Sequence, residues 1–298
     1  DTEKHIYKLN GTAFEMQTGE ITNTANSCWL EADFATERIT CPGIAAHKFY
    51  TIKDADENYI TGLLTSDNKI ATSTANDANA IFYFNGNHLL SYSSGLYIGL
   101  NESDWGFETP GVADSDISAI EFHNVGEGVY NIKSANRWLH SSNTYVNRCS
   151  TQSAHTTEHA WTVTEVTSLP VTIGSVGYST LYAPVALEIP NGVTAYRAER
   201  TDDSIDLYAI EGTIPANQAV ILKGAAGTYQ FTITADVETT ENNVLLGTVE
   251  KIATSSVSNP YTLQTEATAE NGVVMRRYTG NYINGFKMYM SISDAEAA

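Results

Sequence analysis

Positive charge is scarce in this chain of 298 residues. Lys and Arg together number 16 against 35 Asp and Glu, which gives a formal net charge of −19 at pH 7. A field of that sign repels phosphate backbones, so the composition argues against nucleic acid as a partner.

Long apolar runs are missing as well. The uncharged stretch from Thr167 to Leu187 contains two Gly and two Pro among its Ser and Thr residues. A membrane-spanning helix needs about 20 mostly apolar residues, so we expect no membrane span. The chain opens at Asp1 without the apolar segment of a secretory signal, which we interpret as a mature or trimmed start.

Cysteine is too rare for a disulfide scaffold, since the chain has 3. Cys28 and Cys41 lie 13 residues apart across a strand-like hairpin and could form a disulfide, which would leave Cys149 over. A set of buried free thiols is the open alternative.

Proline is also scarce, at 7 residues, whereas tyrosine numbers 17. With many Thr, Ser, Asn and Gly, this composition favours strands and turns over helices. Short alternating runs between turn residues recur, such as Phe49 to Ile52 and Val129 to Ile132, and no window of a dozen residues keeps helical apolar spacing. The predicted fold class is all-β.

A threefold repeat organises the middle of the chain. Tyr50 and Tyr130 occupy equivalent places 80 residues apart, with Leu90 at the midpoint. The final strands of the copies start 39 and then 41 residues apart, at Ala80, Ala119 and Ala160. The first strands and the final strands thus recur with the same spacing. This predicts three copies of about 40 residues, each with about four short strands.

Three such units fit few closed arrangements, because a β-propeller usually needs four or more blades. In period and strand pattern, residues 48–166 resemble a β-trefoil of the ricin-type and related groups. Sugar-binding ricin-type copies usually carry Gln-x-Trp near their final strand, and here the matching places contain only Trp161 and no Gln. Other trefoil groups inhibit proteases or bind actin or receptors, so the resemblance implies the fold and leaves the function open.

Residues 167–298 lack the 40-residue repeat and have a different spacing of strand-like runs. About ten short runs at 8–12-residue spacing, punctuated by Gly, Pro and Asn, predict an antiparallel β-sandwich. The strings GYSTLYAPVALEIPNGVTAY at 177–196 and GTIPANQAVILKGAAGTYQF at 212–231 are similar to a domain of secreted and surface proteins of Bacteroides and Prevotella. That domain accompanies glycan-active enzymes or trefoil-like modules and has no known catalytic role, which implies an extracytoplasmic location, secreted or on the cell surface.

Residues 1–47 fit neither part. Trp29 to Phe34 and Arg38 to Cys41 look like strands. We expect a small N-terminal β segment, which either packs on the trefoil or is the remnant of a preceding domain.

The string His-x-x-Glu-His occurs from His155 to His159. Inverted zinc peptidases use this pattern, but they need both His on one helical turn. In the repeat the string falls in the loop before the last strand, so we favour a polar turn and expect neither metal nor cofactor.

Pairs of acids that could serve a glycosidase occur at Asp54/Asp56, Asp104/Glu108 and Asp202/Asp203. All of them lie in predicted turns, where Asp accepts hydrogen bonds from backbone NH groups. With 35 acids in the chain some pairs arise by chance, so we favour turn chemistry over catalysis.

The candidate ligand site is the aromatic cluster of the second copy, where Trp105 and Phe107 stand among Gly and polar residues. Trp105 would stack on a sugar ring, and hydroxyl groups would donate to Asn101, Asp104 and Glu108. The alternative is that Trp105 or Phe107 fills the trefoil core, as we expect of Trp138 and Trp161.

These patterns predict a non-catalytic extracytoplasmic pair of modules that binds a glycan or another cell-surface partner, as an accessory to a larger surface protein. Two alternatives stay open. One is a glycan-active hydrolase with an unrecognised site. The other is a trefoil protease inhibitor or a structural spacer.

Overall fold

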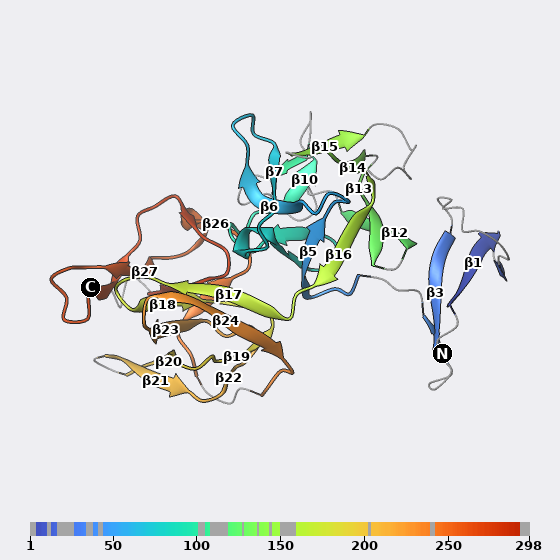
Figure 1. Cartoon of the computed structure of the whole chain (residues 1–298). Coiled ribbons are helices and arrows are strands. Elements are labelled where there is room, and N and C mark those ends of the chain that lie inside the picture. Colours follow the sequence, from blue (N-terminus) through green and yellow to red (C-terminus); the bar gives the residue numbers. More distant parts are fainter. Residues whose placement is uncertain are drawn as a thin grey trace. The chain divides into compact units, whose positions relative to one another are not determined.

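The structure is a computed structural model of the chain (Figure 1). It describes residues 4–10, 13–16, 27–33, 38–40, 44–100, 105–107, 119–126, 128–135, 137–142, 145–149, 159–201, 204–238 and 242–292. Strands make up 55% of it and pair antiparallel, and no helix in the described residues reaches seven residues. The predicted all-β class is confirmed. No helix in these ranges is long and apolar enough to cross a membrane.

The chain divides into two compact units. The first comprises Asp1–Leu89, Ile98–Glu108 and Asp114–Glu165. The second comprises Leu90–Tyr97, Thr109–Ala113 and Val166–Ala298. The three-part division expected from the sequence, with boundaries after residues 47 and 166, stays a prediction.

The first strands of the chain form a small antiparallel sheet in the order β2-β1-β3-β4. They are β1 (Lys4–Asn10), β2 (Ala13–Met16), β3 (Ser27–Asp33) and β4 (Arg38–Thr40). Cys28 lies in β3 opposite Tyr7. Cys41 lies outside the described residues, so the expected disulfide stays a prediction.

Four strands follow in each predicted copy. The first copy has β5 (Lys48–Lys53), β6 (Tyr59–Leu64), β7 (Ile70–Ser73) and β8 (Ile81–Phe84). The second has β9 (Leu89–Ser91), β10 (Ile98–Leu100), β11 (Trp105–Phe107) and β12 (Ile120–Gly126). The third has β13 (Val129–Ser134), β14 (Arg137–Ser141), β15 (Val146–Cys149) and β16 (Trp161–Glu165).

Strand pairing runs through all three copies. The first and last strands pair within the first and third copies, as β5 with β8 and β13 with β16. Neighbouring copies are joined by the pairs β8–β9, β12–β13 and β16–β5. Near the starts of β9 and β12, the backbone N–H of Ile120 donates to the carbonyl of Asn87 over 2.7 Å.

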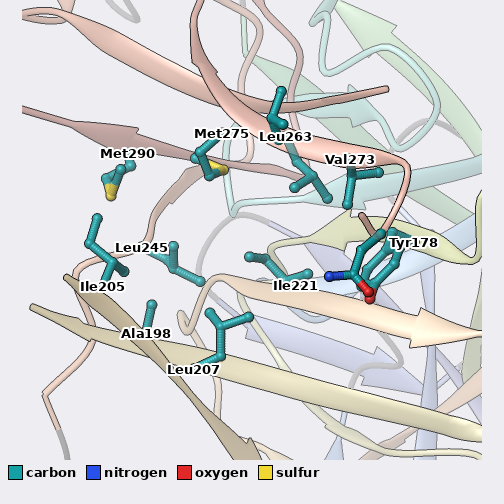
Figure 2. A pocket seen from close by; sticks show the side chains of 12 residues that line it. Tyr178, Ala198, Ile205, Leu207, Ile221, Leu245, Leu263, Val273, Met275 and Met290 are labelled. Carbon is teal, nitrogen blue, oxygen red and sulfur yellow. The ribbon is translucent and has the colours of Figure 1, made fainter. Parts of the chain in front are cut away.

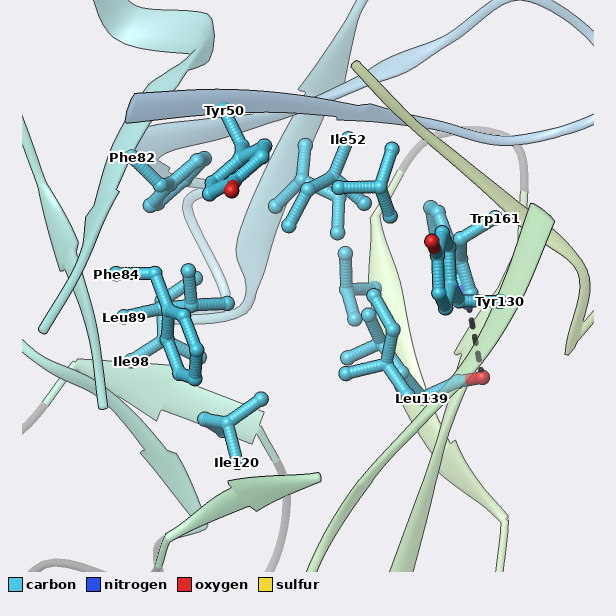
Figure 3. Close-up of a cluster of buried hydrophobic side chains, with 14 of the residues drawn as sticks. Tyr50, Ile52, Phe82, Phe84, Leu89, Ile98, Ile120, Tyr130, Leu139 and Trp161 are labelled. Carbon is cyan, nitrogen blue, oxygen red and sulfur yellow. Dashed lines mark hydrogen bonds between the residues drawn. The ribbon is translucent and has the colours of Figure 1, made fainter. Parts of the chain in front are cut away.

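One buried core collects side chains from the three copies (Figure 3). Its members are Tyr50, Ile52, Ile60, Ile70, Phe82, Phe84, Leu89, Ile98, Ile120, Tyr130, Ile132, Leu139, Val146, Trp161 and Val163.

Trp161 is the largest fully buried side chain in this core. Its indole N–H donates to the carbonyl of Leu139 over 3.2 Å, the dashed line in Figure 3. Trp138 is also buried, with 6% of its surface exposed. The interpretation of both tryptophans as core residues is confirmed.

The hydroxyl of Tyr50 is a polar group at the edge of this core, and it has a hydrogen-bond partner. It donates to the carbonyl of Ala45 over 2.9 Å. Burial, together with the charge of Glu165 on the adjacent strand, raises the pKa of Tyr50 to about 12. The phenol therefore keeps its proton and its hydrogen bond across the physiological range.

The second unit consists of short antiparallel strands in several small sheets. Its strands are β17 (Ser168–Ile173), β18 (Tyr178–Leu181), β19 (Ala186–Glu188), β20 (Val193–Arg200), β21 (Ile205–Ile210), β22 (Thr213–Ile214), β23 (Val220–Gly224), β24 (Gly227–Thr234), β25 (Leu246–Thr248), β26 (Ile252–Ala253), β27 (Pro260–Thr265), β28 (Val273–Arg277), β29 (Tyr282–Ile283) and β30 (Lys287–Ser291). The sheet orders are β17-β24-β19-β22, β18-β23-β20-β21, β25-β30-β27-β28 and β26-β29.

The segment Leu90–Tyr97 belongs to this unit. The ring of Tyr92 lies 5.1 Å from that of Phe286, and its hydroxyl donates to the carbonyl of Pro170 over 3.2 Å. Gly95 has a φ of +67°, and a Cβ there would lie 2.5 Å from the Cα of Gly285. The turn therefore requires glycine at position 95.

Replacing Trp161 by Ala should destabilise the first unit. The change removes the hydrogen bond to Leu139 and leaves a cavity in the shared core, which costs about 3–5 kcal/mol of unfolding free energy. Urea unfolding followed by circular dichroism measures this. Leu63→Ala is the control, since Leu63 is 50% exposed and its loss should change stability by less than about 0.5 kcal/mol. Equal effects of the two changes would contradict the assignment of the core.

Candidate ligand-binding sites

The segment predicted to bind a ligand forms an antiparallel hairpin of β10 and β11. Ile98 pairs with Phe107, Gly99 with Gly106, and Leu100 with Trp105. Ile98 is buried in the core, and Phe107 is partly buried and packs against the same core. The base of the hairpin is therefore held by apolar packing.

The predicted site residues fall unevenly on this hairpin. Trp105 begins β11 and pairs with Leu100, the last residue of β10. Phe107, predicted as a second aromatic contact, packs against the core. The three predicted acceptors, Asn101, Asp104 and Glu108, lie outside the described residues, so their grouping around Trp105 stays a prediction.

The zinc-peptidase string precedes a strand rather than a helix, since β16 begins at Trp161. His155 and Glu158 lie outside the described residues. His159 is buried, and its ring lies 4.9 Å from that of His140 in an edge-on arrangement. In the described part of the chain, no three His, Cys, Asp or Glu residues are grouped so that they could hold a metal ion.

Among the acid pairs, Asp54 is engaged in a structural role. It is 3% exposed, and its carboxylate accepts hydrogen bonds from the backbone N–H of Asp56 and of Asn58, at 3.0 and 2.8 Å. The side-chain amide of Asn58 also donates to it, and so does the hydroxyl of Ser141 in the third copy, at 2.5 Å. The carboxylate thus caps the β5–β6 turn and ties two copies together. The acids at 104, 108, 202 and 203 lie outside the described residues.

Removing the Asp54 carboxylate should weaken the first unit. Asp54→Ala leaves two backbone donors and the Ser141 hydroxyl without their acceptor, which costs about 2–3 kcal/mol. Chemical denaturation measures the loss. Asp56→Ala, which removes an exposed acid from the same turn, should change stability by less than about 0.5 kcal/mol. If Asp54→Ala also left stability unchanged, the capping role would be wrong.

A charged cluster on strands β12 and β13 lies against Trp138 of β14: the ring of His123 is 5.0 Å from the Trp138 ring, and Nζ of Lys133 is 5.8 Å from its centre. The carboxylate of Glu121 accepts from Nε2 of His123 at 3.0 Å and from Nζ of Lys133 at 3.4 Å. Partial burial pushes the pKa of Glu121 up, but the hydrogen bonds from His123 and Lys133 outweigh it and the pKa is lowered overall. Exposed ion pairs of this kind contribute little to stability, so we interpret the cluster as a polar cover over a buried ring.

An apolar pocket of about 370 Å³ lies within the second unit (Figure 2). It is lined by strands of two sheets, β18-β23-β20-β21 and β25-β30-β27-β28. Ala198, Ile221 and Met290 are buried at its floor. At its rim, Ile205 and Leu207 of β21 are 39% and 47% exposed. The pocket therefore has an apolar interior that reaches solvent.

Sequence patterns did not indicate this pocket. Its two rims, β21 and β28, are about 70 residues apart and each ends its sheet in the described part of the chain. The one available signal was the alternation Ile205-Asp206-Leu207, which is also what an ordinary half-buried strand looks like. Only the strand order makes these residues the edge of a cavity.

No protein-family model matches the chain, and no curated protein matches it in sequence.

Proposed function

We propose that residues 48–166 form a β-trefoil and that residues 167–298 form an antiparallel β-sandwich. Support for the trefoil comes from the three sets of four strands and from the pairings β8–β9, β12–β13 and β16–β5 that join the copies. The shared core with equivalent residues Ile60, Ile98 and Leu139 also supports it. A trefoil leaves no free sheet edge, which suits a rigid scaffold that carries binding loops.

On this scaffold we propose a non-catalytic, extracytoplasmic module that binds a glycan on its first unit. The observation that carries the proposal is the pairing of Leu100 with Trp105 in β10 and β11, a strand pair that Phe107 anchors to the core. In the chain, Asn101 directly follows Leu100 and Asp104 directly precedes Trp105. An aromatic residue next to amide and carboxylate acceptors is suited to a sugar ring.

The site is proposed to act through Trp105, with Asn101, Asp104 and Glu108 as acceptors, while Phe107 anchors the hairpin. The other two copies have no Trp in the matching stretch, where the third offers only Tyr145. One small stacking contact supports weak, single-site binding, with a dissociation constant on the order of millimolar to micromolar.

Catalysis is not part of the proposal. Asp54, the buried acid of the first turn, already accepts hydrogen bonds from Asp56, Asn58 and Ser141 and so holds the fold. The acidic composition and the likeness of residues 177–231 to surface-protein domains support an extracytoplasmic location.

Trp105→Ala should abolish glycan binding and leave the melting temperature unchanged, because the proposal places this ring on the ligand. A glycan array identifies the ligand, and titration calorimetry with that glycan then compares the two proteins.

Phe107→Ala is the matched control on the same strand. Because Phe107 packs against the core, its removal should lower the melting temperature. If Trp105→Ala lowers stability by about 3–5 kcal/mol, as truncation of a core tryptophan does, Trp105 belongs to the core and the glycan site is wrong.

A further inference from the structure

The pocket of the second unit lies between side chains of two sheets. Figure 2 shows Leu263, Val273 and Met275 on one side and Ala198, Leu207 and Ile221 on the other. Tyr178 stands at one end and Met290 at the other. A space between two sets of mostly aliphatic side chains suits the alkyl chain of a ligand.

The volume bounds the size of such a ligand. A pocket of about 370 Å³ lies near the lower end of the range found for small-molecule sites. Two of the lining residues are methionines, Met275 and Met290, whose flexible side chains adapt to an irregular apolar ligand. The pocket therefore accommodates an aliphatic chain of medium length.

A lysine lies beside Tyr178. Tyr178 and Lys223 face each other across β18 and β23, and Nζ of Lys223 lies 5.6 Å from the centre of the Tyr178 ring. Lys223 is two residues from Ile221 on the same strand, so both side chains belong to the pocket face of the sheet. Asn271, which also lines the pocket, adds an amide that can donate hydrogen bonds.

Lys223 is available for a ligand. Its ammonium is exposed, and in the described part of the chain it makes no ion pair. An anionic head beside Tyr178 would thus gain an attraction to the Lys223 ammonium, which already lies over the Tyr178 ring. At the opposite end the buried Met290 offers only apolar contact, so the ligand's direction in the pocket is fixed.

From these observations we infer that the second unit binds a medium-chain aliphatic carboxylate, with its chain between the two sheets and its carboxylate beside Lys223. Burial of about ten methylene groups, set against the cost of association, gives a dissociation constant on the order of 1 mM. This site is independent of the glycan site proposed for the first unit.

The test uses decanoate, below the concentration at which it forms micelles, and the full chain labelled at its methionine methyl groups. Decanoate should shift the NMR signals of Met275 and Met290, which line the pocket. Met16, in the first unit, should not move. Unshifted signals of Met275 and Met290, or an equal shift of Met16, would overturn the proposal.

A variant that fills the pocket gives a second, independent measure. Ala198 is fully buried at the floor, so Ala198→Leu should weaken decanoate binding at least tenfold, as measured by calorimetry. Ala209→Leu makes the same change at an exposed residue of β21 outside the pocket and should keep the wild-type affinity within twofold. Wild-type affinity in a folded Ala198→Leu protein would overturn the site. If that variant does not fold, the methionine titration of the wild-type protein decides.

The role of Lys223 is tested by comparing decanoate with decanol. Lys223→Gln should weaken decanoate binding about two- to fivefold, the size expected of an exposed ion pair, and leave decanol binding unchanged. Equal changes for the two ligands would contradict the placement of the carboxylate beside Lys223.

Discussion

The first unit depends on a single core that its three copies share. Ile60 of the first copy, Ile98 of the second and Leu139 of the third meet there, and Trp161 is buried among them. A copy of about 40 residues could not bury these side chains by itself, so none would be stable without the other two. The copies are therefore constrained where their strands face inward, and free to differ in turns and hairpins such as β10–β11.

This constraint explains which parts of the fold could be predicted from the sequence. The final strands begin with the buried residues Ile81, Ile120 and Trp161, with 4%, 4% and 0% of their surface exposed, and Ile120 and Trp161 belong to the shared core. A repeat made of buried residues can be recognised in a single sequence, because those positions accept only large apolar residues. Trp138 and Trp161 were predictable for the same reason.

The candidate ligand sites were less predictable because they depend on register and on strand order. The segment around Trp105 stood out by composition, but only the pairing of Ile98 with Phe107 reveals that Phe107 packs against the core. The pocket gave no local signal at all. It forms where β21 and β28 end two different sheets, and residues such as Leu207 and Met275 come together only through that long-range topology.

An exposed apolar edge carries a cost that bears on the pocket. Ile205 and Leu207 lie on β21, which ends its sheet in the described part of the chain, and such edges promote association between chains. The charge of Asp206 between them and the net charge of −19 oppose that association through repulsion. Repulsion keeps copies apart but leaves the apolar surface in water. A chain-like ligand in the pocket would cover part of that surface, because both residues line the rim. Ile205 and Leu207 would then favour association between chains when the pocket is empty, and contribute to ligand affinity when it is filled.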